Sequence, residues 1–215
     1  MAEVQLHGFD FENWLRNQFF EKFNISYSNK WDVPKEFNKL QIVPEKFRNL
    51  PISIKTCKNN SPIGFGDALR QFRITEDFLL IVGFWEQSGI YKNFVSVEAV
   101  KITANDWRNL FAPLSEKDLQ ILDSIIKDKE KHYNQARQMA KEIKKSFSPT
   151  KIILNPKIDS KNQRRLQCSL PFKVFWQDFV KKEPYKNIDC SLFGEKVPNP
   201  FVSGQRTFKK SLKPE

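Results

Sequence analysis

Hydrophobic residues in the first hundred positions follow two different periods, which predict alternating helices and strands. Residues 9–23 carry apolar side chains at close to the helical period of 3.6, with Asp10 as a candidate N-cap. Residues 50–55 alternate as a strand does. Residues 78–85 form an almost continuous apolar run, typical of a strand buried on both faces, and residues 94–102 are expected to pair beside it.

The second half of the chain predicts further helices and strands. Ser115 and Asp118 have the spacing of a capping box, and a thin apolar seam continues from there to about residue 147 as one long helix. The other predicted elements are a short helix capped by Asn105 or Asp106, strands at residues 151–154 and 164–170, and an irregular tail from residue 184. These patterns predict one α/β domain with a mixed central β-sheet flanked by helices, and a helical and basic C-terminal portion.

Polar residues gather around the strand predicted at residues 50–55. Ser53 and Lys55 share one face of this strand, because side chains two residues apart point to the same side. Turn residues follow as far as Gly66 and predict a loop. Asp67 then stands at the N-cap position of a short predicted helix. One strand face therefore presents a hydroxyl and an ammonium group, and a carboxylate follows at the next helix start.

Two more carboxylates belong to earlier segments. Asp32 ends an extended segment predicted over residues 24–32. Glu12 lies on the first predicted helix and shares a face with Leu15 and Phe19, so it leans toward the core. Each of the polar residues has a structural alternative: a boundary glutamate for Glu12, a turn residue for Asp32, an edge-strand lysine for Lys55 and a helix cap for Asp67.

The charge of the chain favours a polyanionic partner. Its 215 residues include 36 Lys and Arg against 25 Asp and Glu, which gives a formal net charge of +11. A merely basic protein is the alternative. Two histidines and three cysteines without metal-site spacing argue against a zinc centre or a His-based triad. No apolar run approaches the ~20 residues of a membrane span, and the first residues lack a signal-peptide pattern. We therefore expect a cytoplasmic protein.

The order of these residues resembles the PD-(D/E)XK nuclease superfamily, and within it the type II restriction endonucleases. Asp32 matches the aspartate of the first half-motif, with Trp31 in place of proline, and Ser53-Ile54-Lys55 matches the second half. Ser53 replaces the acidic residue of that half, as in members that carry Ser-X-Lys and take a carboxylate from the following helix. The resemblance covers about the first hundred residues and implies a restriction-endonuclease-like fold.

The resemblance implies a Mg²⁺-dependent catalytic site of Glu12, Asp32, Ser53, Lys55 and Asp67. Asp32 would be the central metal ligand, and Asp67 or Glu12 would complete the site. Asp67 is favoured because Ser53 replaces the usual acidic residue and the helix that follows can supply the missing carboxylate. Lys55 would orient or deprotonate the attacking water and stabilise the developing charge. A metal of this kind takes one or two carboxylates together with phosphate oxygens and waters.

Candidate DNA contacts fall in two stretches. The strand predicted at residues 164–170 would turn Leu166 and Cys168 inward with the stem of Arg164, and Gln167 outward together with Arg165 and Ser169. Arginine and glutamine suit guanine and adenine edges in the major groove, although a solvated basic loop is an equal alternative. The complete set of candidates is Lys58, Asn59, Asn60, Arg70, Arg73, Lys161, Asn162, Gln163, Arg164, Arg165 and Gln167.

These observations predict a single nuclease domain over residues 1–215, with a catalytic core at residues 1–112 and a helical and DNA-reading portion at residues 113–215. The expected activity is sequence-specific hydrolysis of double-stranded DNA by a homodimer on a palindromic site. A DNA methyltransferase acting on the same site would be a functional partner. The alternatives are a junction resolvase, a nicking or repair nuclease, or a non-catalytic DNA-binding protein that has lost the acidic position at Ser53.

Overall fold

The computed structural model describes residues 3–20, 30–88, 91–160 and 163–199. Contacts divide the chain into two compact units that interleave along the sequence. The first unit takes its described residues from Met1–Ser61, Asp77–Ile102 and Phe179–Glu215, and the second from Pro62–Glu76 and Thr103–Asp178. The expected roles of residues 1–112 and 113–215 stay a prediction. Within the described ranges, no helix is both long enough and apolar enough to cross a membrane.

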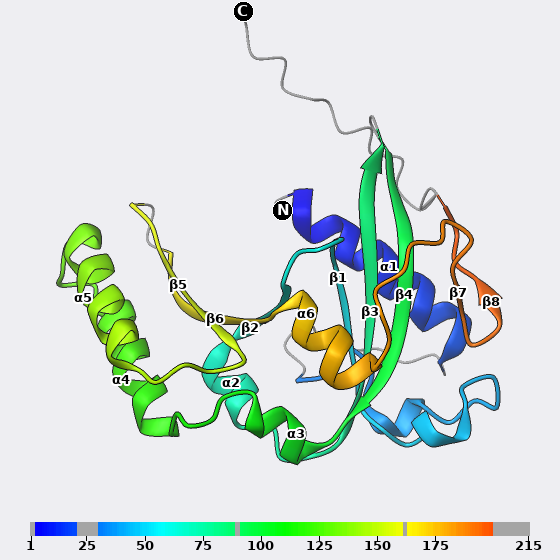
Figure 1. Ribbon diagram of the computed structural model, residues 1–215, viewed down its shortest axis with the longest axis horizontal. Helices are drawn as coiled ribbons and strands as arrows, with labels where there is room; N and C mark the ends of the chain where they lie inside the picture. The colour runs from blue at the N-terminus through cyan, green and yellow to red at the C-terminus, as the bar shows by residue number, and fades with distance from the viewer. Residues whose placement is uncertain (1–2, 21–29, 89–90, 161–162, 200–215) are drawn as a thin grey trace, which may run out of the picture. The chain divides into compact units, whose positions relative to one another are not determined.

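The first unit is built on a three-stranded sheet (Figure 1). Its strands are β1 (Ile52–Lys58), β3 (Phe78–Ser88) and β4 (Tyr91–Ile102), in the order β1-β3-β4. β1 runs parallel to β3, and β3 runs antiparallel to β4. The continuous apolar run is the first part of the central strand β3, where Phe78 to Phe84 are all buried, as predicted. The sequence-based expectation of a mixed sheet in a mixed α/β protein is therefore confirmed.

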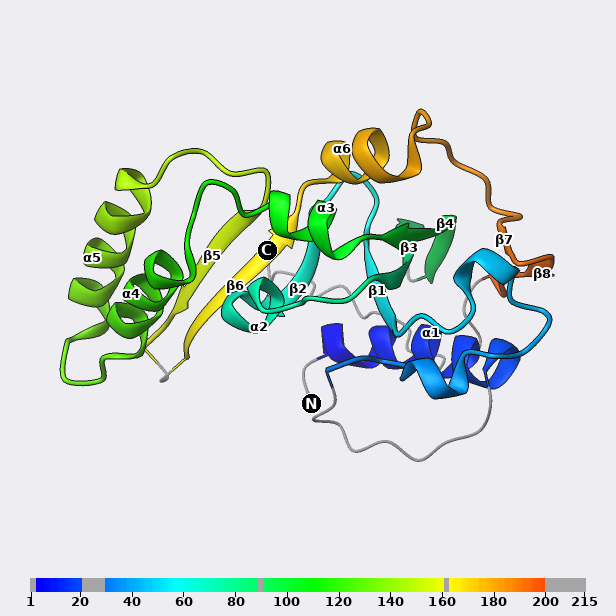
Figure 2. The ribbon, with the colours of Figure 1, turned by 90° about the horizontal axis from the view of Figure 1, so that it is seen from below.

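α1 (Glu3–Phe19) covers one face of this sheet (Figures 1 and 2). Phe11, Leu15 and Phe19 are fully buried in the core that they form with residues of all three strands. Burying each such side chain contributes about 1.5–3 kcal/mol. The helix begins earlier than residue 9, so Asp10 lies inside it and the N-cap assignment is wrong. Residues 3–9 contain no proline, so nothing in this stretch prevents the helix from beginning before Asp10. The expected end of the helix at residue 23 lies outside the described residues.

Two irregular segments complete the first unit. The segment before β1 holds the short 3₁₀ helices η1 (Lys35–Phe37) and η2 (Glu45–Phe47). The buried Asn38 fixes this segment, because its Nδ2 donates to the carbonyls of Phe47 (2.7 Å) and Leu50 (2.9 Å). The tail that was expected to be irregular contains a small hairpin of β7 (Ser191–Leu192) and β8 (Glu195–Lys196).

Gly83 lies under the rings of Phe94 and Phe11, and its replacement by alanine is expected to destabilise the protein. A Cβ at this position would lie 2.6 Å from the ring of Phe94 and 3.1 Å from that of Phe11. Overpacking of this kind costs about 1–3 kcal/mol. Chemical denaturation would measure the loss. Gly64→Ala is the control, because a Cβ there meets nothing within 4 Å. Equal stability of the two variants would contradict the packing described for Gly83.

The second unit contains an antiparallel sheet that was not expected from the sequence. Its strands are β2 (Ile63–Asp67), β6 (Arg164–Leu170) and β5 (Ile153–Ile158), in the order β2-β6-β5. The helices of this unit are α2 (Ala68–Phe72), α3 (Ala104–Asn109), α4 (Glu116–Lys127), α5 (Tyr133–Ser146) and α6 (Phe172–Val174), and α6 continues into the π-helix η3 (Phe175–Val180). α4 and α5 lie together on one side of β5 and β6 (Figures 1 and 2).

Residues 59–62 form the expected turn, but the rest of the predicted loop belongs to β2, so that part of the prediction was wrong. Glycines weaken a strand signal, but the backbone of β2 pairs with β6 and its register shifts between Gly64 and Gly66. Gly66 has a φ of 77°, a conformation that glycine adopts without strain. The two glycines therefore mark a bulge in a strand rather than a loop.

The helical part of the second unit was predicted in part. The capping box of Ser115 and Asp118 starts α4 as expected. The single long helix to residue 147 is wrong, because α4 ends at Lys127 and α5 begins at Tyr133. Asp128 takes an extended backbone at the break and pairs with Lys131. Thr103, rather than either expected residue, caps α3 by accepting from the Asp106 amide.

Candidate active site

Backbone pairing places Asp32 beside the start of β1. The amide of Asp32 donates to the carbonyl of Ile52 at 2.9 Å, and Val33 forms an isolated antiparallel bridge with Ile52. These bonds hold Asp32 and Val33 against the first residue of β1, although about twenty residues separate them in the sequence. The Asp32 carboxylate consequently meets the next residues of β1.

One oxygen of the Asp32 carboxylate is surrounded by donors from β1. Its Oδ2 accepts from the amide of Ile54 at 2.6 Å, from Nζ of Lys55 at 2.8 Å and, more weakly, from Oγ of Ser53 at 3.4 Å. The expected strand face of Ser53 and Lys55 is thus the one that meets Asp32. Ser53 is buried, whereas the side chains of Asp32 and Lys55 remain 27% and 23% exposed. Both charged groups of the ion pair can therefore be reached from solvent.

The other oxygen of Asp32 is available to a ligand. Oδ1 accepts no hydrogen bond from any described residue, while Oδ2 takes all three of those donors. Three donors aimed at one oxygen fix the orientation of the carboxylate. This arrangement leaves a preoriented, partly exposed oxygen of a negatively charged group.

Glu12 brings a second carboxylate to the same place from α1. It forms an ion pair with Arg16, one helical turn later, and its side chain is 16% exposed. Burial raises the pKa of Glu12 above its ordinary value of 4.5, and the charge of Asp32 raises it further, while Arg16 and Lys55 lower it. Arg16 contacts both Glu12 and the main chain of Asp32, and Asp32 pairs with Lys55, so these contacts join the charged groups into one cluster.

Arg16 ties the two carboxylates together and was missed by the sequence analysis. Its Nη2 donates to the main-chain oxygen of Asp32 at 2.7 Å and pairs with Glu12, and its Nε donates to the same oxygen at 3.1 Å. The Glu12–Arg16 spacing of four residues on a helix was the available signal. The contact between Arg16 and the backbone of Asp32 has no signal in the sequence, because the two residues belong to different segments. We use the name carboxylate cluster for Glu12, Arg16, Asp32, Ser53 and Lys55.

Glu12→Gln is expected to stabilise the metal-free protein at neutral pH. Because the folded state raises the pKa of Glu12, it binds the proton more tightly than the unfolded chain, and the charged carboxylate costs stability as the pH rises above 4.5. Glutamine carries no such charge. The gain in unfolding free energy should therefore grow as the pH rises above 4.5.

Denaturation in EDTA at several pH values would measure this difference. The control is Glu36→Gln, which changes an exposed glutamate of the same unit. A difference between Glu12→Gln and wild type that does not vary with pH would contradict the electrostatic description of the cluster.

Asp67 belongs to the second unit, where it caps α2. Its Oδ1 accepts from the amide of Arg70 at 2.8 Å, so the helix-cap interpretation is confirmed. In the β2–β6 register Asp67 stands opposite Gln167. Its role as a metal ligand stays a prediction.

Several candidate DNA contacts already have partners within the protein. Asn59 is buried and donates from Nδ2 to Glu86 at 2.8 Å. Arg73 pairs with Glu116 at 2.7 Å. Arg164 turns inward as expected and donates to the carbonyls of Ile126 and Lys131, which fasten the end of α4 and the loop after it.

The remaining candidates differ in their accessibility. Lys58, Asn60, Arg70 and Arg165 are exposed, and Gln163 and Gln167 are half-buried. Lys161 and Asn162 lie outside the described residues. Ser169 was expected to face outward but is 7% exposed, because its hydroxyl accepts from Nδ2 of Asn155 at 2.9 Å and this end of the strand is covered.

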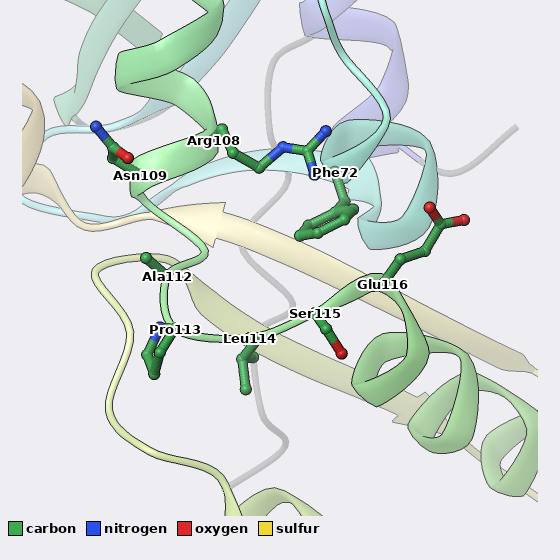
Figure 3. A pocket seen from close by; sticks show the side chains of 8 residues that line it. All are labelled: Phe72, Arg108, Asn109, Ala112, Pro113, Leu114, Ser115 and Glu116. Atoms are coloured by element: carbon green, nitrogen blue, oxygen red, sulfur yellow. The ribbon is translucent and has the colours of Figure 1, made fainter.

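The second unit contains a hollow of about 410 Å³ (Figure 3). It is lined by α2, α3 and the connection to α4, and its charged groups are Arg108 and Glu116. The Arg108 guanidinium stacks 4.0 Å from the ring centre of Phe72. None of the residues predicted for catalysis or DNA binding lines it.

Comparison of the chain with protein-family models, with curated proteins and with solved structures gives no match. The carboxylate cluster and the positive charge of the chain are therefore the features that indicate a function.

Proposed function

We propose that this protein is a Mg²⁺-dependent endonuclease that hydrolyses double-stranded DNA at specific sequences, as type II restriction enzymes do. The observation that carries the proposal is the meeting of Glu12, Asp32 and Lys55 in one partly exposed cluster. Two carboxylates beside a lysine are the residue types that metal-assisted phosphodiester hydrolysis requires. The net charge of +11 supports a nucleic-acid substrate.

The donor set of the cluster fits Mg²⁺. Within the described residues no group of three or more His, Cys, Asp or Glu side chains gathers, so a zinc-type cage is not formed there. Mg²⁺ is commonly held by one or two carboxylates, with water and substrate phosphate in its other positions. Asp32 would hold it through Oδ1, and Glu12 would provide the second carboxylate. Bound Mg²⁺ would supply an activated water and offset the negative charge of the phosphate.

The protein residues would divide the remaining tasks. Lys55 lies at 2.8 Å from Asp32 Oδ2, where its ammonium group can hold the attacking water or the phosphate oxygen that gains charge. The Ile54 amide and Ser53 keep Asp32 in one orientation. Arg16 holds the backbone of Asp32 and the carboxylate of Glu12 at a fixed separation. Water would attack phosphorus and lose a proton to solvent, while the bond to the leaving oxygen of the sugar breaks and that oxygen takes up a proton from solvent.

Incubation with plasmid DNA tests this proposal. In Mg²⁺ we expect discrete fragments, and in EDTA we expect intact plasmid. Binding without cleavage in Mg²⁺ would instead favour a non-catalytic DNA-binding protein, and nicked circles without linear product would favour a nicking enzyme. The proposed homodimer and the companion methyltransferase are not needed for this result, and both stay predictions.

A further inference from the structure

The sheet of the second unit has two chemically different faces. Alternation along β6 puts Leu166 and Cys168 on one side and Arg165 and Gln167 on the other. The apolar side packs against helices, because α4 contacts β6 and α5 contacts β5. Figure 2 shows these two helices on one side of the β5–β6 pair. The opposite side carries the polar residues, and we call it the outer face.

Strand pairing extends the outer face onto β5. Asn155 stands directly opposite Gln167, and Lys157 stands directly opposite Arg165. Lys157 and Arg165 are exposed, and Asn155 and Gln167 are half-buried. The outer face is therefore defined by these four residues, two from each strand. The sequence analysis had considered the β6 pair without its partners on β5.

The outer face carries two cations, Lys157 and Arg165, and one acidic residue borders it, because Asp67 of β2 stands opposite Gln167. β5 and β6 carry no acidic residue. In the described ranges neither Lys157 nor Arg165 forms an ion pair. Like charges directly opposite each other across two strands destabilise a sheet. An anionic partner would relieve this repulsion, and the charge of the face selects a polyanion as that partner.

The neutral residues of the outer face suggest what the partner presents. Asparagine and glutamine can each make paired hydrogen bonds to an adenine edge, and arginine or lysine to a guanine edge. Nδ2 of Asn155 donates to Ser169 at 2.9 Å and, more weakly, to the carbonyl of Ile153 at 3.4 Å. These bonds orient the amide, so that Asn155 offers its Oδ1 to the amino group of a base, while Gln167 can make the paired contact. β2 pairs with β6 only as far as Gln167, so β5 and β6 continue beyond it as a two-stranded ribbon, which fits the width of the DNA major groove. Side chains from both strands can then meet neighbouring base pairs together.

We propose that the outer face of the β5–β6 ribbon is a base-reading surface for the major groove of double-stranded DNA, with Asn155 and Lys157 as specificity residues beside Gln167 and Arg165. This inference rests on the proposed function, since it names how the DNA substrate is selected. Asn155 and Gln167 read adjoining base edges, so their contributions are coupled. Arg165 and Lys157 add base contacts and contacts with the flanking phosphates.

Selection from duplexes with a randomised centre tests the inference. The full chain is incubated with the library in Ca²⁺ to prevent cleavage, and the bound duplexes are sequenced. Affinities are then measured for the selected duplex and for its single-base-pair substitutions, with Asn155→Ala, Gln167→Ala, and the double variant. We expect each single variant to lose about 5- to 150-fold of its preference at one position. The double variant should lose less than the product of the two.

Two further sets of variants control for folding and for charge. Lys157→Gln and Arg165→Gln alter exposed side chains and should lower the preference for the selected duplex without lowering the melting temperature. Lys141→Ala removes an exposed charge from α5 and should leave the preference unchanged. Equal behaviour of the outer-face variants and Lys141→Ala would overturn the inference.

Failure of the inference and failure of the proposed function give different results. A wild-type protein that cleaves and selects a sequence, with outer-face variants that keep this selection, contradicts the inference alone. Cleavage without any sequence preference also overturns it but leaves the nuclease chemistry standing. A wild-type protein that neither binds nor cleaves DNA contradicts both.

Discussion

Asp32→Ala and Lys55→Ala are each expected to remove DNA cleavage in Mg²⁺ while leaving the fold intact. Asp32 offers the free oxygen of the cluster, and Lys55 is the cation beside it. Loss of a positioned proton-transfer or charge-stabilising group lowers a rate by about 10²–10⁴-fold. Single-turnover cleavage of plasmid DNA measures the rate, and binding in Ca²⁺ shows that the variants still recognise DNA.

A matched ion pair elsewhere in the same unit provides the control. Asp77 and Lys101 pair at 2.9 Å and are 38% and 44% exposed. Asp77→Asn and Lys101→Ala should cleave at the wild-type rate. Asp32→Asn keeps the shape of the side chain and separates the loss of a ligand from the loss of a packing group. Wild-type cleavage by either Asp32→Asn or Lys55→Ala would contradict the assignment of the active site.

Glu12→Gln and Asp67→Asn are expected to identify the second carboxylate. The charge coupling of Glu12 with Asp32 and Lys55 favours Glu12 as the ligand, and the sequence alone had favoured Asp67. Glu12→Gln should therefore lower the cleavage rate strongly and raise the Mg²⁺ concentration that any remaining cleavage requires. Asp67→Asn keeps a side-chain oxygen that can cap α2, so its stability should change little.

Magnesium titrations of the cleavage rate distinguish the two residues. An active Glu12→Gln together with an inactive, folded Asp67→Asn would restore the choice made from the sequence. Loss of activity in both variants would assign a carboxylate to the site from each unit. Wild-type rates in both would leave Asp32 as the sole protein carboxylate of the site.

The period of β1 was enough to predict which of its side chains meet the candidate site. Ser53 and Lys55 face Asp32 because alternation in a strand is a local property. The Asp67 cap and the capping box of α4 were predicted for the same reason, since N-caps depend on residues within one turn. Local rules thus supplied most of the elements around the site.

Contacts between distant segments could not be predicted in this way. The bond of Arg16 to the main chain of Asp32 joins two segments without any shared pattern. β2 was missed because Gly64 and Gly66 carry no side-chain signal, and pairing with β6 forms the strand. Without β2 the second sheet could not be recognised. The pairing of Asn155 with Gln167 and of Lys157 with Arg165 therefore required the strand register of the structure.

Sequencing the ends of DNA cut by the wild-type protein tests the central claim most directly. Plasmid and phage DNA would be incubated in Mg²⁺, with EDTA and Asp32→Asn as parallel controls, and every fragment end would be read. The carboxylate cluster and the proposed DNA reading together predict one short sequence at all ends and no cutting in either control. Ends scattered without a common sequence, or equal cutting in EDTA, would contradict a Mg²⁺-dependent, sequence-specific endonuclease.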